Sequence, residues 1–348
     1  MRRHIRHYMN FLSVKHNKTL FLLLGGILFL LLSAVLGILT GAAELSLSDV
    51  LSGLSGGDPT TAAAQIVWYV RIPRVCTAAV CGAALAVSGA VIQGVLSNHL
   101  ASPGMIGINA GAAVAVTVCA AFGILGGWRL SLFAFLGAFG TSLAVSAAAK
   151  HWGASDGVVI LIGAALNSLL GAVSDTVTTL FPDVSIMNSQ FRSGDFSAAT
   201  TAKLLPAAAI VLPTLLVLFA LSNELAILTL GDDHARSLGM HTGRTRLLFL
   251  LLSALLAGTA VSVAGLLSFV GLLIPHAVRR LSGNHASTGG YLLPFCALYG
   301  GAFTVLCDTA ARSLFAPYEL PVGILLAFLG APFFLFLLFR GRRNGGVS

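Results

Sequence analysis

The long apolar segments of this chain constrain its fold more than any other feature. Residues 20–39 are almost wholly apolar, and nine further blocks rich in Leu, Ala and Gly follow. Apolar residues make up 57% of the 348 residues and charged residues only 9%, against roughly 25% charged residues in soluble domains. A bilayer core needs about 20 apolar residues per helix. The sequence therefore predicts an all-α polytopic membrane protein, because a membrane barrel would show short alternating segments instead.

Ten transmembrane helices are expected. The apolar blocks cover about 20–39, 74–96, 104–125, 130–149, 157–181, 203–222, 245–264, 266–281, 291–313 and 321–339. A cleaved signal peptide is the alternative for the first block, although the block exceeds the usual 7–15 apolar residues of a signal. The domain prediction is a cytoplasmic tail over 1–18, a transmembrane domain over 19–340 and a cytoplasmic tail over 341–348.

The distribution of basic residues sets the predicted orientation. With the N-terminus inside, 14 of the 20 Lys and Arg residues fall on the cytoplasmic side. The net charge of +8 thus reflects cytoplasmic loops, and we expect no nucleic-acid partner. The basic residues that break the rule are Arg71, Arg74, Arg129, Arg192, Lys203 and Arg312.

The sequence contains none of the usual catalytic motifs. No lysine follows a glycine, so a Walker A phosphate loop is absent, and the histidines form no HExxH motif. ATP hydrolysis would have to come from another chain. We therefore expect no enzyme activity, no cofactor and no metal site.

Polar residues inside the predicted spans are few and costly to bury. Asn109, Asn167 and Asp175 are candidates for a polar translocation path, with helix–helix hydrogen bonding as the alternative role. Asp308 and Arg312 are four residues apart, so an ion pair within one helix is expected.

A weak internal similarity relates two glycine-rich segments. Gly82 to Gly94 resembles Gly258 to Gly271, and five spans separate them. An odd number of spans inverts the second copy, so an inverted repeat of the kind found in transporters is one explanation. Chance recurrence of glycine in membrane helices is the other.

The loop over about 223–246 is the most patterned polar region. It combines a short charged helical stretch, containing Asp232, Asp233 and Arg236, with a stop at Gly239 that needs a positive φ. Such a segment suits docking to a soluble subunit; a merely solvated loop is the alternative.

Several motifs in order resemble the FecCD family of importer permeases. They are RIPR (71–74), GAALAVSGAVIQGVLSNHLASPGMIGINAGAA (82–113), GDDHARSLGM (231–240), FVGLLIPHAVRRL (269–281) and ELPVGILLAFLGAPFFLFLL (319–338). The chain departs from the family at His99, where a proline is common, and around 191–196.

The resemblance implies a type II ABC importer permease fold and a permease subunit for iron–siderophore complexes, with haem or cobalamin as the alternative cargo. It further implies a second permease subunit, two ATPase subunits, an extracytoplasmic substrate-binding protein and a bacterial inner-membrane location. An ion-coupled secondary transporter stays open as a different class.

The resemblance also implies roles for particular residues. Arg71, Arg74 and Arg312 would dock the binding protein as a basic patch at the outer surface; the alternative is that Asp308 neutralises Arg312 and the other two anchor to headgroups. The residues expected to couple the permease to the ATPase are Gly231, Asp232, Asp233, Arg236, Leu238 and Gly239.

Overall fold

The computed structural model describes residues 2–43, 45–55, 60–151, 156–283 and 290–344, and over these ranges its regular structure is helical. Seven helices in these ranges are long and apolar enough to cross a membrane. They are α1 (Arg2–Leu39), the continuous unit α3–η1–α4 (Ala62–Gln65, Ile66–Arg71, Ile72–Val95), α6 (Gly127–His151), α7 (Asp156–Leu180), α9 (Thr201–Ala220), α12 (Thr242–Ala264) and α15 (Leu292–Ser313).

Three further helices fill the remaining predicted blocks. They are α5 (Ile108–Ala121), α13 (Val270–Ser282) and α16 (Val322–Asn344). Each of the ten apolar blocks predicted from the sequence thus contains a helix. Residues 2–18 of the predicted tail belong to the same helix as the first span, and the cytoplasmic location of this tail stays a prediction.

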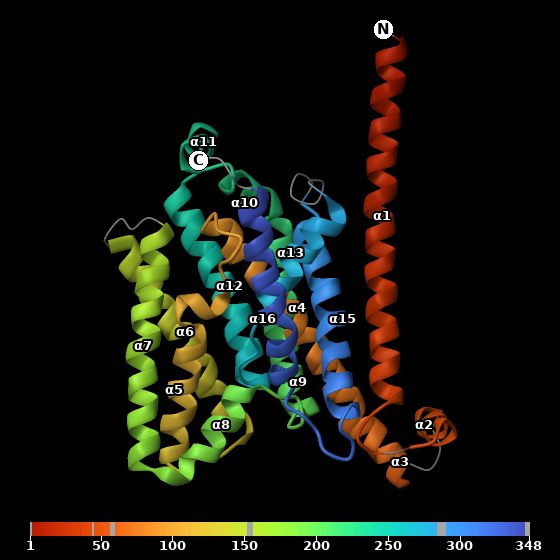
Figure 1. Cartoon of the computed structure of the whole chain (residues 1–348), viewed down its shortest axis with the longest axis vertical. Coiled ribbons are helices and arrows are strands. Elements are labelled where there is room, and N and C mark those ends of the chain that lie inside the picture. The colour runs from red at the N-terminus through yellow and green to blue at the C-terminus, as the bar shows by residue number, and fades with distance from the viewer. Residues whose placement is uncertain (1, 44, 56–59, 152–155, 284–289, 345–348) are drawn as a thin grey trace.

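Short helices gather at the two ends of the bundle (Figure 1). At one end lie α10 (Ser222–Leu228), α11 (Asp232–Ser237) and the end of α16, and the N-terminal half of α1 points the same way. At the other end lie α2 (Leu47–Leu54), α3 and α8 (Ser185–Ser193). We call these the α11 end and the α2 end.

Helix α4 is the centre of the bundle. Most of its residues from Arg74 to Val95 are buried, and it packs against α15, α12 and α13. Close approach depends on glycine, because a Cβ on Gly82 would collide with the Gly300 carbonyl and a Cβ on Gly89 would collide with Gly271. Small residues let helix backbones pack at short range in membranes.

The two segments of the proposed repeat differ in local structure. Gly82 to Gly94 lies within the single helix α4, whereas the second segment is broken between α12 and α13. Gly265 and Phe269 both have positive φ, 71° and 68°, in that break. The inverted repeat therefore stays a prediction without support from these segments.

Candidate functional site

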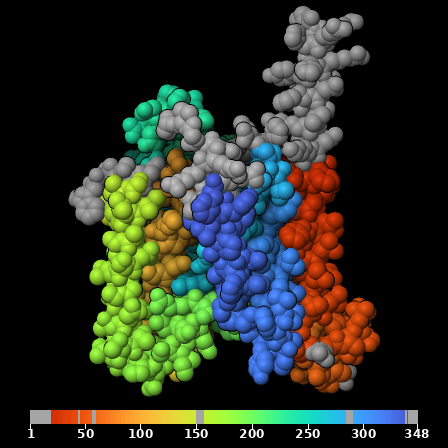
Figure 2. Space-filling model, viewed as in Figure 1, coloured from red at the N-terminus to blue at the C-terminus, as the bar shows by residue number. Residues whose placement is uncertain are grey.

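A cavity of about 600 Å³ opens beside α7. Its walls come from η2 (Pro103–Ile106), α5, α7, α8, α16 and the connection between α12 and α13. Figure 2 shows the molecular face hollowed between α7 and α8 on one side and α16 on the other. We call this space the Asn109 cavity.

Backbone turns shape the floor and rim of this cavity. Gly107, with φ of 86°, ends η2 and starts α5. The break after α12 is fixed to the end of α8, because the Leu266 amide donates to the Phe191 carbonyl at 2.9 Å. The Gly323 amide at the start of α16 donates to the Gly194 carbonyl at 3.1 Å. Three elements distant in sequence therefore meet at the rim.

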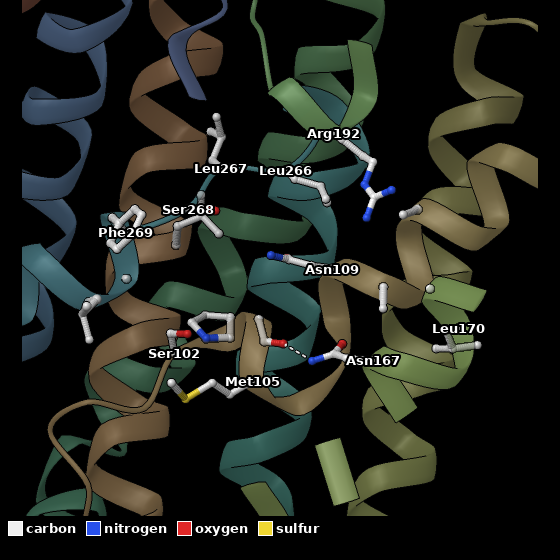
Figure 3. Close-up of a pocket in the computed structure, with 18 of the residues that line it drawn as sticks. Ser102, Met105, Asn109, Asn167, Leu170, Arg192, Leu266, Leu267, Ser268 and Phe269 are labelled. Atoms are coloured by element: carbon white, nitrogen blue, oxygen red, sulfur yellow. Dashed lines mark hydrogen bonds between the residues drawn. The ribbon is translucent and has the colours of Figure 1, made fainter. Parts of the chain in front are cut away.

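Two of the three predicted path residues line the Asn109 cavity (Figure 3). The Asn167 side-chain amide donates to the Gly104 carbonyl at 3.0 Å and ties α7 to η2. The Asn109 amide makes no side-chain hydrogen bond within the described part of the chain, so it is available to a solute in the cavity. Its apolar surroundings make that amide a strong site for a polar group.

Asp175 is not among the cavity residues. Its side chain is 70% exposed, and it pairs with Arg192 at 3.6 Å. The cavity is instead lined by Arg192 from α8 and Ser174 from α7. Sequence periodicity placed Asn167 and Asp175 near one helix face but could not show that α8 would bring Arg192 to Asp175.

The α10–α11 segment is a helical pair at the α11 end; the loop pattern predicted one short charged helix, which is α11. Gly231 and Gly239 flank α11 with φ of 101° and 82°, which confirms the prediction of a positive φ at Gly239. A Cβ at either position would meet no neighbour, so only the backbone conformation requires glycine there.

The charged side chains of α11 make few ion pairs and remain accessible to solvent. Asp232 accepts from Arg246 at 3.1 Å and lies 3.9 Å from Arg236. Arg236 and Leu238 are each 66% exposed. Because surface ion pairs contribute little stability, these groups are free to exchange partners.

The three predicted docking arginines come together at the α2 end, but they are buried. Their relative exposure is 2% for Arg71, 4% for Arg74 and 2% for Arg312. In this structure the three guanidinium groups do not form an exposed patch, and docking of a binding protein by these arginines stays a prediction. Their donors bind groups of the same chain: carboxylates for Arg74 and Arg312, and backbone carbonyls for Arg71.

Arg74 is the centre of this charge cluster. Its guanidinium binds Asp308 through Nε and Nη2 at 3.0–3.1 Å, binds Glu319 at 2.7 Å and lies 3.7 Å from Asp195. Arg312 lies 3.5 Å from Asp308, which confirms the expected pair within α15, and it also donates to the Gly37 carbonyl. The cluster joins α4 to α15, to α1 and to two loops.

Arg71 binds backbone instead of carboxylates. It donates to the carbonyls of Ile38, Leu39 and Ala43 at 2.7–2.9 Å. The carbonyls of Ile38 and Leu39 lie at the end of α1, where a helix leaves acceptors without internal partners, and Ala43 lies just beyond it. Arg71 therefore caps α1 rather than lying at a headgroup surface.

Asp195 and Glu319 were missed by the sequence analysis. Both lie in loops, between α8 and α9 and between α15 and α16, and both are about one third exposed at 32% and 35%. They carry the accessible edge of the cluster. No motif in the sequence indicates that these loops reach Arg74.

Known membrane permeases are similar to this chain over most of its length. The FecCD transport family model matches residues 28–340. The hemin transport system permease protein HmuU of Yersinia pestis is 38% identical over 332 residues, covering 93% of this chain and 97% of that protein. The iron-uptake system permease protein FeuB of Bacillus subtilis is 35% identical over 319 residues, covering 90% and 94%.

A further relative and a solved structure agree. The ferric enterobactin transport system permease protein FepG of Escherichia coli is 33% identical over 313 residues, covering 90% of this chain and 93% of that protein. A metal-chelate type ABC transporter in an inward-facing conformation has a TM-score of 0.80 and 32% identity, covering 91% of this chain and 98% of that one. These matches extend over nearly all ten predicted spans.

Proposed function

Because the chain belongs to the FecCD transport family, we propose that this permease subunit imports an iron–siderophore complex in an ATP-driven transporter of the bacterial inner membrane. The observation that carries the mechanism is the α10–α11 pair at one end of a membrane bundle, with α11 exposed and α10 packed below it. Haem is the alternative cargo, supported by the similarity to a hemin permease, and cobalamin is a third chelate of the same kind.

The α10–α11 pair is the proposed seat of the ATPase subunits. Helix α11 presents Asp233, Arg236 and Leu238 outward, and glycines with positive φ define both of its ends. A short rigid helix pair transmits closure of a partner to the spans that it joins, here α9 and α12. This assignment puts the α11 end, with both chain termini, in the cytoplasm.

The Asn109 cavity is the proposed part of the translocation path contributed by this subunit. It opens on the hollow beside α7, where a second permease subunit would supply the facing wall. The Asn109 and Asn167 amides would hydrogen-bond the oxygen-rich periphery of a metal chelate. Asp175, which is exposed on α7, would face the path only when two permease subunits associate.

Docking of the substrate-binding protein at the α2 end now needs an exchange of partners. Arg74 already binds Asp308, Glu319 and Asp195, so a carboxylate of the binding protein would have to replace the two exposed ones, Asp195 and Glu319. Arg71 and Arg312 would act by holding α1 and α15 in place around Arg74. Charge pairs at such a rim chiefly set orientation and association rate.

Ion-coupled secondary transport has less support from the same geometry. It needs an ionisable group in the membrane that alternates between charge states. Asp308 is paired with two arginines, and Asp175 is paired with Arg192 and largely exposed.

The test is copurification. The tagged full-length chain, expressed in its own host, should retain an ATPase subunit, and Arg236→Glu should weaken retention while leaving membrane abundance unchanged. Lys203→Gln, a change at the opposite end, is the matched control and should retain the ATPase fully. Equal retention by the wild type and by Arg236→Glu combined with Gly239→Val would contradict α11 as the seat.

A further inference from the structure

A second cavity, of about 390 Å³, lies at the α11 end and is separate from the Asn109 cavity. It is enclosed by the C-terminal end of α4, one face of α10 and the ends of α13 and α15. It is lined by Ser222, Leu225 and Ala226 of α10 and by Thr229, which follows the helix; this is the spacing of one helix face. We call it the α10 cavity.

Arg279, from the last turn of α13, is the main charged group of this cavity. Its Nη1 donates to the Gln93 side-chain oxygen at 2.5 Å. Gln93 is 1% exposed, and its own amide donates to the Gly271 carbonyl at 3.2 Å, so both of its polar atoms are occupied. A buried side chain therefore fixes the guanidinium in position.

The other N–H donors of Arg279 have no carboxylate partner among the described residues that line the cavity. A guanidinium has five N–H donors, and only the bond to Gln93 is formed within the described part of the chain. None of the described residues lining the cavity is Asp or Glu. Glu224, the acid on α10, does not line the cavity.

Other polar groups around the cavity can donate as well. Ser97 and Ser222 carry hydroxyls and His99 carries an imidazole, whereas the Thr229 hydroxyl already donates to the Ala226 carbonyl at 2.7 Å. Burial and the positive charge of Arg279 lower the pKa of His99. The cavity therefore combines one fixed cation, several donors and an uncompensated positive potential.

We propose that the α10 cavity binds a phosphate-type oxyanion, held by Arg279 and by the hydroxyl of Ser222. A planar guanidinium with free paired donors matches the oxygens of a phosphate in a bidentate geometry. Phosphate chemistry of this kind comes either from the free anion or from the headgroup of an acidic phospholipid. His99, in the loop after α4, supplies a further donor at the rim.

The bound anion would bridge α4, α13 and α10. Helix α10 leads directly into α11, so an occupied cavity holds the α10–α11 pair against the core of the bundle. This consequence for transport rests on the proposed coupling role of α11. The binding itself does not, and it is measured on the permease alone.

The test measures thermal unfolding of the purified full-length chain in detergent with increasing inorganic phosphate, against chloride at equal ionic strength. Binding to the folded state should raise the midpoint in a saturable way. Arg279→Gln should weaken the apparent affinity by roughly 10-fold or more, since charged hydrogen bonds contribute about 1.5–3 kcal/mol. Arg280→Gln, an exposed neighbour outside the cavity, is the matched control and should behave as the wild type.

Ala226→Leu is the second variant, because it fills the cavity and leaves every charge in place. It should remove the phosphate effect even if Arg279→Gln does not fold. A second outcome is that phosphate has no effect while nanodiscs of phosphatidylglycerol stabilise the chain more than nanodiscs of phosphatidylcholine. If the same variants lose that stabilisation, the ligand is a lipid headgroup and the proposed site is supported. Equal stabilisation of the wild type and both variants, or none by either probe, overturns the proposal.

Discussion

The two ends of this molecule use the same residue types in opposite ways. At the α2 end, Arg74 and Asp308 are 4% and 1% exposed and bind each other through several atoms. At the α11 end, Arg236 is 66% exposed and reaches Asp232 only at 3.9 Å. Charges at the α2 end thus hold the chain to itself, whereas charges at the α11 end remain available to another chain.

The difference teaches that burial decides the role of a charge here. Removing one partner from a buried pair leaves an uncompensated charge and costs several kcal/mol. An exposed pair contributes about 0–1 kcal/mol because solvent already stabilises each charge. The effects of charge substitutions on stability should therefore concentrate at the α2 end, and their effects on ATPase binding at the α11 end.

The largest effect is expected from Asp308→Asn. It removes the charge that neutralises Arg74 and Arg312, so the free energy of unfolding should fall by about 3–5 kcal/mol. Thermal unfolding in detergent measures the change. Asp233→Asn, an exposed position on α11, should stay within about 0.5 kcal/mol of the wild type. Equal losses at the two positions would remove the distinction between the ends.

Next in size is Gly239→Val. A β-branched residue at φ of 82° is strained by about 1–3 kcal/mol, which would displace the end of α11. Uptake and stimulated ATPase activity should be lost while membrane abundance stays normal. Gly243→Val, in the first turn of α12 with open space and ordinary φ, is the control and should keep more activity. Full uptake by Gly239→Val would show that α11 only makes contact with solvent.

Arg236→Glu is expected to have a small effect on stability and a larger effect on binding of the ATPase. Reversal at this exposed position should change stability by less than about 0.5 kcal/mol. It should nevertheless slow association with the ATPase several-fold, because rim charges act mainly on association rate. Surface plasmon resonance with purified ATPase subunit measures this rate, and an unchanged rate would argue against a charged contact at this residue.

The smallest effect concerns pH. Burial and Arg279 lower the pKa of His99 in the folded chain from its ordinary value of 6.5. The unfolded chain then binds this proton first, so stability is constant above pH 6.5 and falls as the pH drops from 6.5 toward the folded-state pKa. His99→Gln should reduce that slope in thermal unfolding measured at several pH values. An identical slope would show that His99 does not contribute.

The positions of the spans followed from the sequence because each apolar block is long enough to be read on its own. The helix stop at Gly239 and the Asp308–Arg312 pair were also predictable, since both depend on neighbours within four residues. The contact between Arg74 and Asp308, which are 234 residues apart, could not be predicted. Hydrophobic periodicity indicates which face of a helix is buried, but it does not identify the helix that packs against that face.

The candidate cavity was predicted only in part for the same reason. Asn109 and Asn167 were identified because polar side chains in apolar helices are rare. The short helix α8 is too polar and too short to be recognised as a span. The sequence therefore could not predict that Arg192 lines the cavity or that it pairs with Asp175, which lies outside the cavity.

The central claim is that this chain is a permease moved by a partner ATPase through α11. Its most direct test is uptake of a radiolabelled ferric siderophore by proteoliposomes containing the chain, its ATPase and its binding protein. We predict uptake that requires ATP on the α11 side, stops with vanadate, persists with proton and sodium ionophores, and is absent in Gly239→Val. Uptake that continues without the ATPase and collapses with an ionophore would contradict the account.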